Sequence, residues 1–422
     1  MVLQTEHAAR YAAQLLCALG VDQSIESMGD HPAVSWHRSG LLNVSGDVLP
    51  LPLSAHADGA LLALNALAPN AELPMSGAVL MGERARLRET ICEGRKTAGG
   101  LGKLLPAIDG FIALNLVREE DWDLIPAWLE ADVQDWAAIE TYVQTRLADA
   151  LVERGAEMGL AVSQSEIPDR PKTWFSVDAF QPTPPKAGPL IVDLSGLWAG
   201  PLASSLLAKC GASVIKIEGP NRPDGMRLGH AGFFDLLNAG KDCVALDFKK
   251  TDDLGRLRNL LSRADIVIEA SRPRALKQLG LDAQAFVSRK PGMIWARLTA
   301  YGQKTNRIGF GDDIGVSAGL SEVMRLTYGK ACFVGDAIAD SVNGIHLALA
   351  ILAFYRQGGG VIIDISMRDV LRYAMGDIEV SELRNTAHSW REILTGADKS
   401  FYPMRESLGQ AKPLGADTDR LC

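Results

Sequence analysis

Two aspartates precede a long apolar run in the stretch FVGDAIADSVNGIHLALAIL, residues 333–352. The apolar run predicts a helix that begins near Asp340. An aspartate at a helix start can accept backbone N–H groups and is favoured by the helix dipole. The small residues Ala339, Ser341 and Gly344 also leave room for a reactant. Because a positioned carboxylate can attack a thioester or phosphate, the pattern leaves two interpretations open, a helix cap and a nucleophile.

Asp312 and Asp313 form a second acidic pair in FGDDIGVSAG, residues 310–319, after glycines at positions 309 and 311. One interpretation is another helix cap. The other is an acid close to Asp340, whose protonation would then be coupled to that of its neighbour. His346 lies one turn into the apolar run, and we expect it to be a packing residue with satisfied hydrogen bonds rather than a base.

Glycines and basic residues mark two further segments. The cluster in TAGGLGKLLPAIDG, residues 97–110, is either a flexible loop or one that a ligand approaches closely, and it lacks the GxGxxG spacing of dinucleotide sites. Arg222 and Arg227 follow a predicted strand, and Lys241 comes soon after. These cations are either a rim for a nucleotide phosphate or solvated surface charge.

Short apolar runs alternate with helical patterns after residue 188. Helices are expected at 199–212 and 251–264, and strands at 189–195, 213–220, 242–248, 265–271 and 292–302. This alternation predicts an α/β fold with a parallel, doubly wound sheet, whose ligand lies beyond the carboxyl ends of the strands. The preceding segment, 164–188, is proline-rich and is expected to be an extended linker.

The remaining segments predict four further parts of the chain. Residues 96–163 form a small α+β domain with the glycine loop, 189–385 the large domain, and 386–422 a C-terminal tail. Residues 1–95 contain HAARYAAQLLCALGV and ADGALLALNAL, which echo the helical segments near 199 and 340. We interpret them as a degenerate, shortened copy of the large domain, although alanine- and leucine-rich helices also resemble one another by chance.

Composition excludes several classes. The 422 residues carry a formal charge of −8, which argues against a general nucleic-acid binder. The sequence contains no run of about 18 uncharged apolar residues, which is the length that would predict a membrane span. The N-terminus lacks the basic region of a signal peptide. The six cysteines are scattered without a CxxC pair, which indicates reduced thiols in a cytoplasmic protein and no metal site.

Five motifs in order give the chain a family resemblance. They are LIVDLSGLWAGPLASSLLAKCGASVIKIEGPNRPDGMR, LLNAGKDCVALDFKK, RADIVIEASRPRALKQLGLD, GMIWARLTAYGQ and VGDAIADSVNGIHLALAILAFYRQGGGVIIDISMRDVL, between residues 189 and about 375. Together they resemble the class III (CaiB/BaiF-type) CoA-transferases, which include formyl-CoA transferase, carnitine CoA-transferase and alpha-methylacyl-CoA racemase. The resemblance implies a Rossmann-like large domain, a smaller domain and an interlocked homodimer. Here the small domain comes first, so the order looks rearranged or fused.

The resemblance also implies a chemistry. Asp340 would be the nucleophile that takes CoA from an acyl-CoA and passes it to a carboxylic acid, without a metal. Asp312 would be a helper acid, standing where the racemases have a histidine. The glycine loop, Gly99, Gly100 and Gly102, would shield intermediates from water. The implied CoA contacts are Trp198, Ala199, Arg227, Leu237, Lys241, Ala270 and Ser271. A CoA-ester racemase and a CoA-ester-binding protein without turnover remain alternatives.

Overall fold

The computed structural model describes residues 4–422, and its largest sheet has seven strands. Their order is β6 (Ser176–Ala179), β12 (Val361–Ser366), β11 (Ile294–Thr299), β10 (Ile266–Glu269), β7 (Leu190–Asp193), β8 (Ser213–Glu218) and β9 (Asp242–Ala245). Strands β7 to β12 pair in parallel, which confirms the α/β prediction. The antiparallel edge strand β6 makes the sheet mixed and lies inside the predicted linker. Strand β12 was not predicted.

Helices cover both faces of this sheet because successive strand residues point to opposite sides. Ile266 and Ile294 share one core with α9 (Ala199–Lys209) and α16 (Ile338–Arg356). Val267 and Trp295 share the opposite core with α11 (Thr251–Arg263) and α13 (Ala283–Arg289). The connecting helices are α10 (Ala231–Asn238), α12 (Ala275–Gln278), α14 (Gly311–Ser317), α15 (Leu320–Tyr328) and α17 (Met367–Ala374).

Helix α16 is the central helix of the first core. Its 19 residues are long and apolar enough to cross a membrane, but 83% of the most apolar window is buried inside the protein. A helix that is apolar on all sides is what such a buried position requires. Gly344 lets it approach α9 closely, since a Cβ there would lie 2.8 Å from the Ala199 carbonyl oxygen.

The N-terminal segment adds helices to the same core. Its elements are β1 (Gln4–Thr5), α1 (His7–Ala18), β2 (Gly29–Asp30), α2 (Pro32–Arg38), α3 (Leu41–Ser45), α4 (Leu53–Leu67) and α5 (Gly77–Leu87). Residues of α1, α4 and α5 pack in one cluster with α9 and α16. The echoing sequences are thus both helical, and the interpretation as a degenerate copy stays a prediction.

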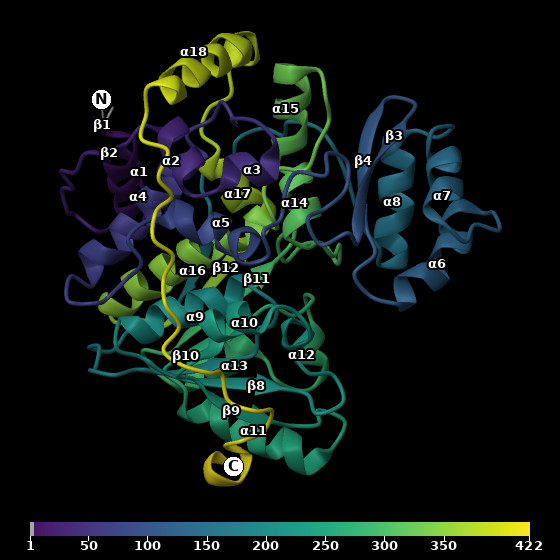
Figure 1. Cartoon of the computed structure of the whole chain (residues 1–422). Coiled ribbons are helices and arrows are strands. Elements are labelled where there is room, and N and C mark those ends of the chain that lie inside the picture. Colours follow the sequence, from purple (N-terminus) through teal and green to yellow (C-terminus); the bar gives the residue numbers. More distant parts are fainter. Residues whose placement is uncertain (1–3) are drawn as a thin grey trace.

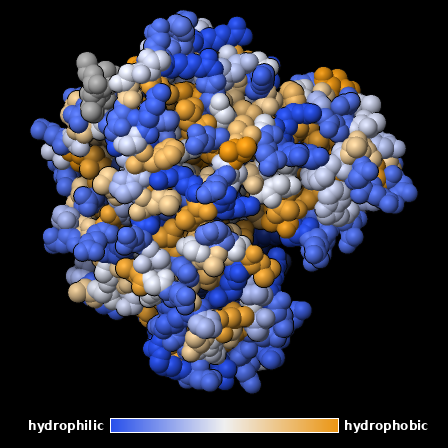
Figure 2. All heavy atoms as spheres, in the orientation of Figure 1, coloured by the Kyte–Doolittle hydropathy of each residue, from blue (hydrophilic) through white to orange (hydrophobic). Residues whose placement is uncertain are grey.

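A smaller unit has its own antiparallel sheet and core. It contains β3 (Gly102–Ala107), β4 (Gly110–Asn115), α6 (Glu120–Leu129), α7 (Trp136–Val143), α8 (Ala148–Met158) and β5 (Ala161–Gln164). It projects from the body of the molecule (Figure 1), and a notch separates it from the lower part of the seven-stranded domain on the face shown in Figure 2. The apolar run DGFIALNL, residues 109–116, predicts a strand, which β4 confirms, whereas β3, directly after the glycine loop, was not predicted.

Near the end of the chain, a long irregular segment connects α18 (Leu383–Thr395) to the last helix, α19 (Thr418–Leu421). Residues 397–417, here called the strap, run across the molecule from α18 toward β9 (Figure 1). Arg405 of the strap donates to both carboxylate oxygens of Glu83 in α5, at 2.8 and 2.6 Å. Asp417 accepts the Cys243 N–H of β9 at 2.9 Å. The strap therefore ties the N-terminal helices to the sheet.

Candidate active site

Asp340 lies in the first turn of α16, yet it does not cap that helix. The N-cap residue is Ala337, whose own side chain makes no cap hydrogen bond. Instead, Oδ1 of Asp340 accepts the N–H of Ala199, the first residue of α9, at 3.3 Å. The carboxylate is therefore at the N-terminus of a second helix, where the helix dipole favours negative charge. Unlike its buried neighbours on either side, Asp340 is partly exposed.

Gly311 makes room for this carboxylate. A Cβ at Gly311 would lie 2.0 Å from Asp340 Oδ2 and 2.8 Å from the Ala337 carbonyl oxygen. Helix α14 therefore reaches the start of α16 only because its first residue has no side chain. The sequence analysis did not single out Gly311, although a glycine immediately before two aspartates was visible.

Asp312 is brought next to the same helix start. Its Oδ1 accepts the N–H of Ala337 at 2.8 Å. Ala337 has φ of 48°, a left-handed conformation that is unfavourable for alanine. Asp312 thus supports the turn from which α16 begins, and like Asp340 it is partly exposed.

Asp313 faces the smaller unit instead. Its Oδ1 accepts the Phe310 N–H at 2.9 Å and the Asn115 side-chain amide at 3.2 Å. The first bond closes the first turn of α14, whose N-cap is Phe310, so Asp313 supports the helix start from its third position and is not itself the N-cap. Asn115 in turn pairs with Gly102 between β4 and β3. The end of the glycine loop is therefore linked to α14, whereas Gly99 and Gly100 are exposed, with open space where a side chain would be.

A cation from the N-terminal segment completes this group of acids. Arg84 of α5 donates from Nε to Asp336 Oδ2 at 2.8 Å, and from Nη2 to Asp336 Oδ1. Asp336 is fully buried, and Arg84 is 15% exposed. The sequence analysis missed Arg84, because no local pattern places residue 84 beside residue 336.

The environment shifts the acids toward the neutral form. Burial raises the pKa of Asp340 to about 7, with Arg84 opposing the rise and Asp312 adding to it. Burial, together with Asp336, raises the pKa of Asp312 to about 6. Burial likewise raises the pKa of Asp313 to about 7. The acids of such a cluster titrate together, and Asp340 gains its charge near neutral pH.

The turn after β7 carries two of the predicted CoA contacts. Leu197 has φ of 62°, and its N–H donates to Asp224 Oδ1 at 3.0 Å. Trp198 is 1% exposed and packs edge-on against Phe233, with ring centroids 4.7 Å apart. Its indole Nε1 has no hydrogen-bond partner among residues 4–422. The turn thus presents the Ala199 N–H to Asp340, and the buried indole N–H of Trp198 has no partner among the described residues.

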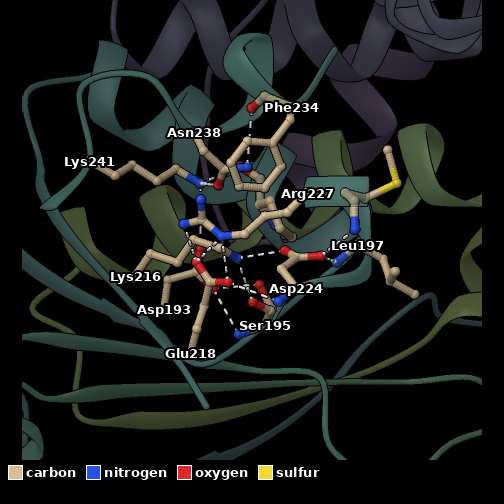
Figure 3. A network of polar contacts seen from close by, with 12 residues as sticks. Asp193, Ser195, Leu197, Lys216, Glu218, Asp224, Arg227, Phe234, Asn238 and Lys241 are labelled. Atoms are coloured by element: carbon tan, nitrogen blue, oxygen red, sulfur yellow. Dashed lines mark hydrogen bonds and ion pairs between the residues drawn. The ribbon is translucent and has the colours of Figure 1, made fainter. Parts of the chain in front are cut away.

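The predicted phosphate contacts Lys241 and Arg227 belong to a network of charged side chains beyond β7 and β8 (Figure 3). Lys241 is 2% exposed, and its Nζ donates to Ser204 Oγ at 2.7 Å and to the Pro201 carbonyl at 2.9 Å. Its ion-pair partner is Asp193, at 3.5 Å. Burial lowers the pKa of Lys241 to about 7, although Asp193 opposes this shift.

Arg227 is engaged by Glu218 in the same network. Its Nε and Nη2 lie 2.9 and 2.7 Å from the Glu218 carboxylate oxygens, and its guanidinium lies 4.7 Å from the Phe234 ring centroid. Lys216 pairs with Asp224 at 2.8 Å in the interior. The alternation in SVIKIE places Lys216 and Glu218 within a buried strand, a signal that the sequence analysis did not use. The phosphate roles of Arg227 and Lys241 stay predictions.

The remaining predicted contacts are spread over two places. Leu237 is fully buried in α10. Ala270 and Ser271 follow β10, where Ala270 is exposed and the Ser271 hydroxyl is buried without a hydrogen-bond partner among residues 4–422. The Nδ1–H of His346 donates to the Val342 carbonyl oxygen at 2.8 Å, and its Nε2 lies 2.9 Å from Tyr11 Oη. This confirms the packing interpretation of the histidine.

Replacing Lys241 with methionine separates a structural role from phosphate binding. We expect the free energy of unfolding to fall by about 3 kcal/mol, because Asp193 loses one of its buried cations. Urea unfolding at pH 7 measures this loss, with the exposed Lys249→Met as control. A variant of unchanged stability that binds CoA at least tenfold more weakly would instead identify Lys241 as a phosphate contact.

Known proteins resemble the part of the chain that carries this site. Residues 187–393 match the sequence model of CoA-transferase family III. This segment of the chain belongs to CoA-transferase family III. The match includes Asp340, Asp312 and the β7 turn, but not Arg84, the glycine loop or the strap. It confirms the family that the five motifs indicated, whereas the rearranged order of domains stays a prediction.

The curated relatives also match only part of the chain. The probable fatty acyl-CoA transferase Rv3272 of Mycobacterium tuberculosis is 32% identical over 47% of this chain and 52% of its own length. The succinate–glutarate CoA-transferase of Agrobacterium fabrum is 30% identical over 44% of this chain and 52% of its own length. An orthorhombic crystal structure of Rv3272 is 30% identical, with 51% of this chain and 59% of the Rv3272 chain covered and a TM-score of 0.41. The chain thus spans about half the length of the curated relatives it matches.

Proposed function

We propose that this protein transfers CoA from an acyl-CoA to a carboxylate, with Asp340 as the covalent nucleophile. The observation that carries the proposal is the setting of the carboxylate. It is partly exposed, accepts the Ala199 N–H at 3.3 Å and lies against a glycine on its other side. These features leave room for an attacking oxygen, and the segment that holds it matches the family.

The proposed reaction proceeds through two covalent intermediates. A carboxylate oxygen of Asp340 attacks the acyl carbonyl carbon, the C–S bond breaks, and the CoA thiolate leaves with the electron pair. The thiolate then attacks the Asp340 carboxyl carbon of the mixed anhydride and releases the donor acid, which leaves an aspartyl-CoA thioester. The acceptor carboxylate attacks this thioester, and the reverse steps produce the new acyl-CoA and free Asp340.

The surrounding groups have distinct roles in this reaction. The Ala199 N–H orients the attacking carboxylate and later donates to the aspartyl carbonyl oxygen of the mixed anhydride and the thioester. Asp312 holds the turn that begins α16 and acts as the helper acid. Gly99 and Gly100, which are exposed and have open space where a side chain would lie, are proposed to close over the intermediates and exclude water.

CoA is proposed to bind along the carboxyl ends of β7 and β10. Two buried polar groups there, Trp198 Nε1 and the Ser271 hydroxyl, have no hydrogen-bond partner within residues 4–422. A ligand that supplies acceptors to both would satisfy them. The Arg227 guanidinium is already paired with Glu218, so phosphate binding there requires that pair to open. The interlocked homodimer also remains part of the proposal, and a monomer in light scattering would contradict it.

Mass spectrometry of the labelled protein tests the proposal. The protein is incubated with succinyl-CoA, acetyl-CoA or palmitoyl-CoA, chosen because the relatives are named for small acids and for fatty acyl-CoA. We expect an adduct on the peptide containing residues 333–352 that hydroxylamine removes. Bound CoA without an adduct would contradict the nucleophile and favour a binding protein, and exchange of the alpha proton without an acceptor acid would favour a racemase.

Labelling is expected to depend on pH. Asp340 attacks as the carboxylate, and its pKa is raised to about 7, so the reactive form increases as the pH rises through neutrality. We expect the initial labelling rate at pH 8 to be roughly tenfold that at pH 6. Asp340→Asn gives the background from hydrolysis of the ester. A rate that falls over this range after that correction would contradict attack by this carboxylate.

A further inference from the structure

Arg84 is the cation that faces the acids at the start of α16. It belongs to α5, in the N-terminal segment, and lies outside the part of the chain that matches the family. The charged groups around it are Asp336 before α16, Asp340 within α16, and Asp312 on α14. From α9 comes an uncharged donor, the Ala199 N–H. A guanidinium in this position favours the carboxylate forms of Asp340 and Asp312.

The structure holds the Arg84 guanidinium in one place. Two of its nitrogens bind the two oxygens of Asp336, a geometry that fixes both position and plane. Its central carbon lies 4.8 Å from the Trp198 ring centroid, a cation–π contact. Trp198 therefore serves as a platform for Arg84 in addition to any role toward CoA.

Helix α5 is itself anchored on both sides of Arg84. Glu83 pairs with Arg405 of the strap, and the Arg86 guanidinium donates to the Tyr402 carbonyl at 2.8 Å. Gly77 packs against α4, since a Cβ there would lie 2.0 Å from the Ala57 carbonyl oxygen. An anchored helix presents its arginine at a defined position, which a flexible surface segment does not do.

One side of the guanidinium remains available. Within residues 4–422, Nη1 of Arg84 has no hydrogen-bond partner, and the side chain is 15% exposed. Solvent therefore reaches part of the Arg84 side chain while two of its nitrogens are held by Asp336.

We propose that Arg84 is a positioning residue of the active site, which through its pair with Asp336 fixes the turn that begins α16 and brings a positive charge to the acids there. This inference rests on the proposed role of Asp340 as nucleophile. It makes α5 of the N-terminal segment part of the site. The two partners act on Asp340 with opposite sign, because Arg84 favours its carboxylate form and Asp336 disfavours it.

Titration of the Asp340 carboxyl tests the proposal without any CoA ester. The full-length protein is labelled with [4-¹³C]aspartate, and the Asp340 carbon resonance is identified by its loss in Asp340→Asn. We expect the titration midpoint to rise by about one pH unit or more in Arg84→Gln, and to fall in Asp336→Asn. Arg84→Lys keeps the charge without the two-nitrogen pairing. Its titration midpoint is expected to lie between those of Arg84→Gln and the unchanged protein.

Arg405→Gln is the matched control, because it breaks the other ion pair of α5, away from Asp340. We expect its midpoint to equal that of the unchanged protein. Midpoints that stay unchanged in Arg84→Gln and Asp336→Asn, or that move in the same direction, would overturn the proposal. If Arg84→Gln does not fold, the proposal is decided by whether the Asp340 titration midpoint falls in Asp336→Asn. Absence of the acyl adduct in the unchanged protein would refute the transferase while leaving this titration valid.

Discussion

Asp340→Asn is expected to abolish CoA transfer while CoA binding persists. The asparagine amide oxygen still accepts the Ala199 N–H that Asp340 Oδ1 accepts at 3.3 Å, so the start of α9 is preserved. An amide cannot form the mixed anhydride, and loss of a covalent nucleophile typically costs a thousandfold or more in rate (about 10³–10⁶). The measurements are exchange rates with the acyl-CoA panel, the adduct on residues 333–352, and CoA affinity by calorimetry.

Two further variants separate chemistry from folding. Asp252 is an exposed aspartate in the first turn of α11, on the other face of the sheet, and Asp252→Asn is expected to retain full activity. Asp340→Ala removes both the nucleophile and the acceptor for Ala199, so it is expected to lower stability where Asp340→Asn does not. An Asp340→Asn protein that still exchanges CoA would refute covalent catalysis by this residue.

The parts of the fold that were predicted are those whose signals are local. The parallel strands are continuous Val- and Ile-rich runs because both faces of the sheet are covered, and five of them were found. Asp340 was found because an acid at the start of an apolar helix is visible within a few residues. Strand β6 was missed because its four residues are all exposed and lie in a proline-rich segment.

The contacts of the site could not be predicted, because they join distant parts of the chain. Arg84 meets Asp336 across 252 residues, through the packing of α5 on the core. The same limit applies to the basic residues near β8. Their charges suggested a phosphate site, but their partners Glu218 and Asp193 become apparent only when the strands are assembled. A sequence pattern shows which residues are charged and not which of them already have a partner.

Gly311→Ala tests the geometry of the nucleophile without changing any functional group. The new Cβ would lie 2.0 Å from Asp340 Oδ2 and 2.7 Å from the Ala337 Cβ, so the carboxylate or the turn before α16 must move. Misplacement of a reacting group by about 1 Å can cost about a hundredfold in rate. We expect a decrease of at least that size in labelling and exchange.

Gly315→Ala, in the same helix α14, is the matched control. Its Cβ would lie 3.4 Å from the nearest atom, Leu320 Cδ1, an ordinary contact. Alanine favours helix formation relative to glycine at either position, so a loss of activity confined to Gly311→Ala cannot come from helix propensity. Thermal unfolding of both variants checks that they fold. Equal activity of the two variants would mean that the carboxylate need not lie where Gly311 now makes room for it, and the proposed attack geometry would be wrong.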